Sequence, residues 1–250
     1  MQAISKAKIK LFTSLQAKKY RYRHLKFLIE GKKLLQEAIN SAYLPEFVLL
    51  REDKTDWWKE NYGEKEAFIA DQALFSQLST MQQSEGVMAM LAFPSENFCR
   101  PTRRTAMPGL GFVLDSIQDP GNLGTLMRSL DYLGIQDIYL GPGCVDPLNP
   151  KVLRSSMGAI FRMNIHVLEQ VESFVMQAHD RVLMADMSGK AINEIDIPQD
   201  ALILIGNEAN GVSPKLKSLH LNSIAIPRLG QGESLNASTA AAMIAWEIVR

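Results

Sequence analysis

Polar side chains able to bind a ligand follow three apolar stretches in the second half of the chain. They lie in "DSIQDPGNLGTLMRSL" at 115–130, in "LIGNEANGVSP" at 204–214 and in "QGESLNASTA" at 231–240. Each segment combines glycine with amide, carboxylate or hydroxyl groups, and the first adds a guanidinium. Such groups can hold a polar substrate by hydrogen bonds and one permanent positive charge. The candidate residues are Asp119, Asn122, Gly124 and Arg128 in the first segment, Gly206, Glu208 and Gly211 in the second, and Ser234, Leu235 and Asn236 in the third.

Each segment, taken alone, also has a purely structural interpretation. Asn122 could cap a helix, the Gly206 segment could be a plain turn, and Ser234 or Asn236 could cap the C-terminal helix. Arg128 could be a surface charge, although it lies about one and a half turns into the expected helix, too far for a capping role. These alternatives stay open from the residues themselves.

The second half of the chain alternates short apolar strands with helices. Strands are expected at 111–117, 137–141, 163–168, 181–187, 201–206 and 223–227, and helices at 122–134, 149–160, 171–179 and after 236. This alternation predicts an α/β fold with a parallel sheet covered on both faces. Ligands bind such sheets at the carboxyl ends of the strands, where the three segments lie.

The first half predicts a smaller α/β unit of about 95 residues, an ordinary domain size. Apolar residues at helical spacing predict an amphipathic helix over 31–42, and a capping Asp71 opens a short helix at 71–79. Strands are expected at 45–52 and 86–94. Residues 95–108 carry prolines and arginines without apolar periodicity, so we predict domains at 1–94 and 109–250 joined by this linker.

Composition places the chain among globular proteins and gives its N-terminus a distinct charge. Hydrophobic residues make up 46% and charged residues 22% of 250 residues, and the net charge is zero. Two cysteines, without a secretory signal or a membrane-length apolar run, predict a cytoplasmic protein with reduced thiols. Residues 1–33, however, hold ten Lys or Arg and one acid. Such a segment attracts phosphate backbones, or else it is a solvated helix surface.

Aromatic residues alternate with the basic ones in "KKYRYRHLKF" at 18–27. Tyr20, Tyr22 and Phe27 could stack on bases while the cations contact phosphates. The predicted RNA-binding residues here are Lys18, Lys19, Arg21, Arg23 and Lys26. The histidines are scattered at 24, 166, 179 and 220, so no metal site is expected.

Together, in order and spacing, the three segments resemble the three motifs of the SpoU/TrmH class of RNA ribose 2′-O-methyltransferases, in the SPOUT superfamily. The resemblance covers about residues 110–250 and includes "NPKVLRSSMGAIF" at 149–161. "FLIEGKKLLQEA" at 27–38 and the residues after it resemble the small substrate-binding domain, similar to a ribosomal-protein fold, of members that act on rRNA.

This resemblance implies a deep trefoil knot at the C-terminus whose loops bind S-adenosylmethionine. Gly206, Ile226 and Leu235 would offer main-chain groups to the cofactor, with Asn207, Glu208, Ser234 and Asn236 around it. Arg128 would be the catalytic arginine, and Asn122 would orient it or the ribose. Ser234 and Asn236 would complete the catalytic pocket. Arg154 would add an RNA contact.

The resemblance further implies a homodimer through the knotted domain and RNA as substrate, with rRNA favoured over tRNA. Arg128 is described in the family as a base, but the permanent charge of a guanidinium favours contacts with phosphate and with the developing alkoxide.

Two other functions remain as alternatives. One is an RNA-binding or ribosome-assembly protein that keeps the fold without turnover. The other is a nucleotide-binding oxidoreductase, against which the missing GxGxxG motif argues.

Overall fold

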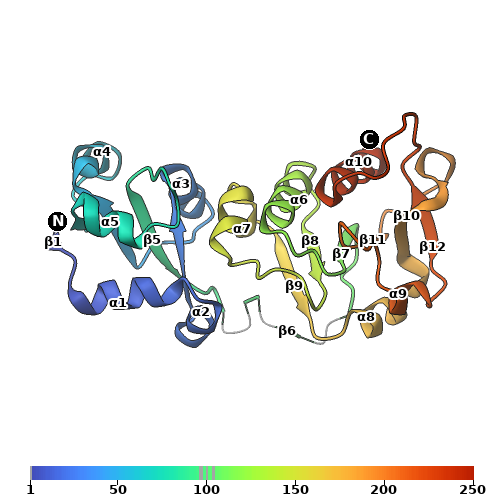
Figure 1. Ribbon diagram of the computed structural model, residues 1–250, viewed down its shortest axis with the longest axis horizontal. Coiled ribbons are helices and arrows are strands. Elements are labelled where there is room, and N and C mark those ends of the chain that lie inside the picture. The colour runs from blue at the N-terminus through green and yellow to red at the C-terminus, as the bar shows by residue number, and fades with distance from the viewer. Residues whose placement is uncertain (1, 96–97, 100, 103–104) are drawn as a thin grey trace. The chain divides into compact units, whose positions relative to one another are not determined.

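Two compact units make up the chain. The computed structural model describes residues 2–95, 98–99, 101–102 and 105–250, with only the backbone described at 101–102. One unit comprises residues 1–98 and 148–161, and the other comprises 99–147 and 162–250 (Figure 1). Of the predicted linker, residues 96–97, 100 and 103–104 lie outside the described residues. The predicted domain 109–250 differs from the second unit, because residues 148–161 pack with the first.

The first unit is built around a mixed sheet whose strands run in the order β1-β4-β3-β5-β2. β5 is antiparallel to β2 and β3, and β4 is parallel to β1 and β3. The strands are β1 (Gln2–Ala3), β2 (Lys26–Glu30), β3 (Phe47–Arg51), β4 (Phe68–Ala70) and β5 (Val87–Ala92). The helices are α1 (Lys6–Leu15), α2 (Lys18–His24), α3 (Lys32–Asn40), η1 (Glu52–Lys54), α4 (Thr55–Tyr62), α5 (Gln72–Leu78), α7 (Pro150–Ser155) and η2 (Ala159–Phe161).

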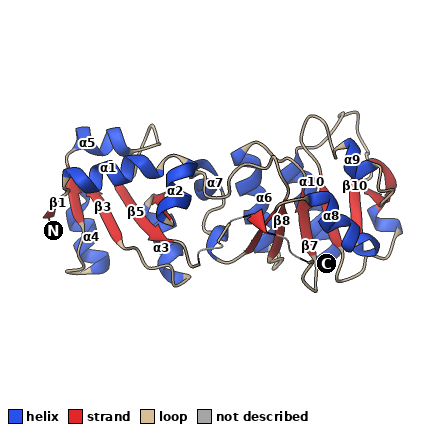
Figure 2. Ribbon diagram, turned by 90° about the horizontal axis from the view of Figure 1, so that it is seen from below, coloured by secondary structure: helices blue, strands red, loops and turns tan. Residues whose placement is uncertain are grey.

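Helices cover both faces of this first sheet. Figure 2 shows α1 and α5 on one face and α3 and α4 on the other. Phe12 of α1 and Phe75 of α5 are buried in one core with Phe47 and Phe68, whose rings stack 4.3 Å apart. Asp71 caps α5 as predicted, since its Oδ1 accepts a hydrogen bond from Leu74 N at 2.7 Å.

The second unit contains the predicted parallel sheet, which is confirmed. Its strands run in the order β12-β10-β11-β7-β8-β9-β6, and every neighbouring pair is parallel. The strands are β6 (Pro101–Thr102), β7 (Gly111–Leu114), β8 (Asp137–Leu140), β9 (Asn164–Leu168), β10 (Val182–Ala191), β11 (Leu202–Ile205) and β12 (Asn222–Ala225). The helices are α6 (Pro120–Tyr132), α8 (Val171–Gln177), η3 (His179–Arg181), η4 (Ile192–Glu194), α9 (Pro214–Lys217) and α10 (Ala237–Val249).

The central strands of this sheet are buried on both faces, as their continuous apolar sequences require. Figure 1 shows α6 and α10 on one face and α8 and α9 on the other. β7 and β11 are neighbours, with Leu114 paired to Ile205. Their carboxyl ends therefore lie side by side, and the loops that follow, at 115–119 and 206–211, must be adjacent.

β10 and β12 contact each other in an unusual way. Ile224 of β12 pairs with both Ala185 and Lys190 of β10, so residues 186–189 leave the ladder between two paired positions. A side chain on Gly189 would lie 2.6 Å from the backbone of Ser223 and Ile224. Only glycine permits so close an approach of two backbone segments.

Two predicted elements differ from the structure. The helix expected over 149–160 ends at Ser155, because Met157 and Gly158 adopt positive φ angles of 50° and 94°. Leu28, whose spacing fitted the helix at 31–42, belongs instead to β2, and Gly31 at φ 113° separates the two. No described helix is long and apolar enough to span a membrane.

Candidate functional site

Asn122 links the three predicted segments through its side-chain amide. Its Nδ2 donates to Glu208 Oε1 at 2.7 Å, and its Oδ1 accepts from Asn236 Nδ2 at 2.8 Å. Asn236 Oδ1 meanwhile accepts from Ser238 N at 2.9 Å, which caps α10. This bond orients the Asn236 amide, and the carboxylate of Glu208 orients that of Asn122. The chain of bonds therefore joins the starts of α6 and α10 to the loop after β11.

Asn122 is free for this role because another residue caps α6. Asp119 is the N-cap, and its Oδ1 accepts from Asn122 N at 2.9 Å. Pro120 follows at the first helical position, where a missing N–H costs nothing. The structural alternative for Asn122, a capping role, is therefore wrong.

The loop after β11 is a tight turn held by Asn207. The main chains of Asn207 and Gly211 exchange hydrogen bonds of 2.9 and 2.8 Å, and Asn207 Nδ2 donates to Ser116 O at 2.9 Å. A Cβ on Gly206 would lie 2.2 Å from Gly211 C and Val212 N. Position 206 therefore requires glycine.

Asp115 is a site residue that sequence reasoning missed. It is 4% exposed, and its Oδ2 accepts from Ser213 N at 2.7 Å, which connects the end of β7 to the start of α9. An acid directly after a buried strand was the available signal, because a buried carboxylate needs hydrogen-bond partners.

Cys144 lies beneath the same loops. Its Sγ donates to Leu114 O at 3.3 Å, and burial raises the pKa of the thiol to about 11. The thiol is therefore neutral at physiological pH and unsuited to nucleophilic chemistry.

The remaining predicted catalytic and cofactor residues lie on α6 or in the loop between β12 and α10. Arg128 is exposed on α6, so its guanidinium is accessible from solvent. Ser234 and Leu235 lie in an exposed loop just before Asn236, and Leu235 is 49% exposed. Ile226 is half-buried directly after β12. The irregular segments 206–211 and 226–236 are each joined to Asn122 by one side-chain hydrogen bond, from Glu208 and from Asn236.

Some of the predicted RNA-binding residues are exposed to solvent, and others already make ion pairs or hydrogen bonds within the protein. Lys18, Lys19 and Arg23 are exposed on α2, whereas Lys26 is ion-paired with Glu46. Arg21 is 3% exposed, and its Nη1 donates to Leu15 O at 3.1 Å and to Gln16 O at 2.7 Å. Its guanidinium therefore ties α2 to the end of α1 and does not face solvent.

The aromatic residues of this segment divide in the same way. Tyr20 is 37% exposed and stacks on His24 with centroids 6.3 Å apart. Tyr22 contacts the edge of Phe93, and Phe27 is fully buried. Tyr20 is thus the most exposed aromatic ring of the three, and Tyr22 is half-buried.

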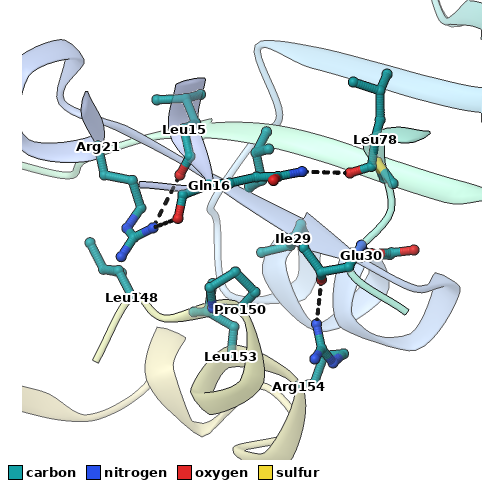
Figure 3. A pocket seen from close by; sticks show the side chains of 13 residues that line it. Leu15, Gln16, Arg21, Ile29, Glu30, Leu78, Leu148, Pro150, Leu153 and Arg154 are labelled. Atoms are coloured by element: carbon teal, nitrogen blue, oxygen red, sulfur yellow. Dashed lines mark hydrogen bonds between the residues drawn. The ribbon is translucent and has the colours of Figure 1, made fainter. Parts of the chain in front are cut away.

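Arg154 lines a pocket inside the first unit, on the opposite wall from α1 and β2. Figure 3 shows it extending from α7 toward Ile29 and Glu30, with Arg21 at the other end of the pocket. Arg154 Nη1 donates to Thr80 Oγ1 at 2.7 Å. This arginine fastens the 148–161 segment to the rest of the unit, so we leave it and Arg21 out of the RNA contacts proposed below.

The described residues contain no group of three or more His, Cys, Asp or Glu side chains placed to hold a metal ion. His166, for example, is buried and its Nε2 lies 2.8 Å from Asp137 Oδ1, a structural pairing between β9 and β8.

Comparison with protein families matches both units. The profile described as "SpoU rRNA Methylase family" matches residues 109–246, more than half of the chain. The profile described as "MRM3-like substrate binding domain" matches residues 6–89.

Two relatives match most or nearly all of the chain. The chain is 28% identical over 252 residues to the 23S rRNA (guanosine(2553)-2′-O)-methyltransferase of Bacillus subtilis, covering 99% of this chain and 98% of the relative. It is 31% identical to an uncharacterised tRNA/rRNA methyltransferase of Synechocystis, covering 74% of this chain and 67% of the relative.

Solved structures show the same architecture. A TrmH-family protein from Porphyromonas gingivalis has a TM-score of 0.81 at 29% identity, covering 98% of both chains. A structure described as an RNA 2′-O ribose methyltransferase has a TM-score of 0.82 at 25% identity, covering 100% of this chain and 98% of that one.

Proposed function

Because this chain belongs to the SpoU rRNA methylase family, we propose that it transfers a methyl group from S-adenosylmethionine to a ribose 2′-hydroxyl of RNA. We propose 23S rRNA as the substrate, since the relative that matches nearly the whole chain is a 23S rRNA 2′-O-methyltransferase. We further propose that the protein acts in the cytoplasm.

The observation that carries this proposal is the hydrogen-bonded chain Glu208–Asn122–Asn236. It joins residues that are 86 and 114 positions apart in the sequence. A fold that needed only stability could close these loops with apolar contacts. Polar side chains bonded to one another beside an exposed arginine instead suit a site that orients a polar substrate.

The residues present fit the cofactor. A Cβ at Gly206 would collide with the turn at 211–212, so only glycine fits at this position. The main chain at 206 therefore carries no side chain. Gly206, Ile226 and Leu235 offer main-chain groups to the cofactor in our proposal, with Asn207, Glu208 and Ser234 around it. The bound cofactor supplies an already activated methyl group on its sulfonium.

The protein then has to position the 2′-hydroxyl and stabilise the charge that develops on its oxygen. Positioning alone is worth roughly 7–11 kcal/mol in well-oriented reactions. We assign this task to Asn122, Ser234 and Asn236, and we assign the charge to Arg128. Its planar guanidinium can bind a neighbouring phosphate through two parallel N–H donors. Phosphate or water then receives the proton.

The outer face of α2 is the RNA-binding surface in our proposal. Lys19 and Arg23 are four residues apart, and Tyr20 and His24 form a second such row, so cations and rings lie side by side on one helix face. Tyr20 and His24 already stack with planes 18° apart. Phosphates would contact the first row and an unpaired base the second.

Methyl transfer to RNA tests this function directly. We expect the full chain to methylate 23S rRNA extracted from a strain that lacks the gene, with loss of activity in Arg128→Ala. S-adenosylmethionine binding, measured by calorimetry, should persist in that variant because Arg128 serves the RNA. A chain that binds the cofactor weakly or not at all would instead be a non-catalytic RNA-binding protein, the alternative above.

Arg128→Lys separates the two roles of the arginine. An electrostatic grip predicts a reduced rate without a new ionisation in the pH profile. Full turnover with a lower pH optimum would show that a titrating base suffices and would contradict our assignment.

We also propose that β12 is threaded through a loop, forming the knot that the family resemblance implies. The double pairing of Ile224 and the 2.6 Å approach at Gly189 support this crossing. Gly189→Val should then prevent folding, measured as loss of soluble protein. A soluble, normally melting variant would contradict a close crossing.

The exposed face of α10 supports a homodimer. Met243, Trp246 and Val249 recur every three residues and are 46%, 56% and 42% exposed. We propose that these side chains pack against a second copy. Light scattering should give twice the monomer mass of 27.9 kDa, and Trp246→Glu should halve it; a monomeric native chain would contradict the dimer.

A further inference from the structure

Asp131 occupies a position on α6 where an acid is unfavourable by itself. It lies in the last turn, where the helix dipole presents negative potential. Its carboxylate is neutralised by Arg162, the residue at which the chain re-enters the second unit. Arg162 Nη2 lies 2.7 Å and Nε 3.0 Å from Asp131 Oδ2, and Nε also lies 3.2 Å from Oδ1.

Asp131 is also the neighbour of Arg128 on the helix surface. Residues three apart on a helix lie on the same face, with Cβ atoms about 5–6 Å apart. The side chain of Asp131 retains 21% of its exposure, and Arg128 is exposed. Without Arg162, the closest cation available to Asp131 on α6 is therefore Arg128.

We propose that Arg162 is a positioning residue that holds the Asp131 carboxylate away from Arg128. The guanidinium of Arg128 then stays open to the RNA phosphate, and no second anion competes for it. This inference rests on the proposed role of Arg128. The Asp131–Arg162 ion pair would then have a functional role, in addition to the structural one of connecting the start of β9 to α6.

Three variants distinguish this positioning role from a purely structural role of the ion pair. Arg162→Ala should lower kcat/KM for 23S rRNA about three- to fivefold, because an exposed pair of this kind competes only modestly. Asp131→Asn alone should stay within about twofold of the native rate, since it removes the competitor. Arg162→Ala combined with Asp131→Asn should recover that rate.

Ionic strength provides a second measurement that fastening would not predict. A released carboxylate is screened by salt, so the ratio of native to Arg162→Ala activity should shrink between 0.05 and 0.5 M salt. Melting temperature and cofactor affinity are measured for each variant as controls. If Arg162→Ala is insoluble, Arg162→Gln takes its place with the same expectation.

The results separate this inference from the proposed function. If Asp131→Asn or the double variant is as impaired as Arg162→Ala, the ion pair is a structural fastening and the inference fails. If Arg128→Ala keeps full activity, the assigned role of Arg128 fails first. Loss of activity in Arg128→Ala, together with recovery of activity in the double variant, supports both the role of Arg128 and the positioning role of Arg162.

Discussion

Gly206→Ala tests whether the turn after β11 forms the floor of the cofactor site. The added methyl group would lie 2.2 Å from Gly211 C and Val212 N and 2.6 Å from Gly211 O. These are main-chain atoms, so no side chain can rotate to make room. The turn is further held by two hydrogen bonds between Asn207 and Gly211. The loop at 206–212 must therefore open.

Overpacking of this kind costs about 1–3 kcal/mol in a well-packed region. For a chain of this size, that cost lowers the melting temperature by about 2–12 °C. Opening the turn also displaces Asn207 and Glu208, so S-adenosylmethionine affinity should fall at least about tenfold, because misplaced binding groups lose their geometry. Thermal melting with and without cofactor, together with calorimetry, measures both effects.

Gly230→Ala is the matched control. It lies in the loop before Asn236, and an added Cβ there has no atom within 4 Å. We expect it to melt and to bind cofactor like the native chain. A Gly206→Ala variant with native melting and native affinity would show that the turn is neither tight nor part of the cofactor site.

Three further predictions concern single side chains. Asn122→Ala should lower kcat about a hundredfold through lost positioning, while the cofactor dissociation constant changes less than tenfold; an unchanged kcat would exclude Asn122 from the site. The raised pKa of Cys144 predicts a native stability advantage that is complete below pH 9 and lost as pH rises from 9.0 to about 11, measured by denaturant unfolding against Cys144→Ala, which should lack this slope. Arg23→Ala should weaken RNA binding and reduce its salt slope by about 1 without changing the melting temperature, whereas Arg21→Ala should lower the melting temperature; the reverse result would contradict the orientations of the two arginines.

The fold of the second unit was predictable because its strands are short and continuously apolar. A continuously apolar strand such as "LILI" at 202–205, buried on both faces, is typical of the middle of a parallel sheet. Placing three glycine- and amide-rich segments after such strands brings them to one edge. Hydrogen bonds then join Asn122 to Glu208 and Asn236, a detail of side-chain geometry that spacing alone could not supply.

Other features depend on tertiary contacts that no local pattern encodes. The apolar pattern at 149–160 predicted a helix that includes Gly158. In the structure, a Cβ at Gly158 would lie 2.7 Å from Glu37, which is more than a hundred residues away in the sequence. Arg21 looked like its neighbours in a basic run, yet it points inward to two carbonyl groups. Alternation of charge and aromatic character on a helix of seven residues does not reveal which side chain faces the core.

The return of residues 148–161 to the first unit limits how the protein can be divided. Leu148, Pro150 and Leu153 line the pocket beside β2. A fragment that stops at residue 98 lacks them and would expose the facing apolar residues Leu15 and Leu28 to water. During synthesis, the first unit cannot be completed until the ribosome has made residue 161. An engineered chimera that exchanges the first unit between related proteins must therefore carry this internal segment with it, or the transferred unit will be incomplete.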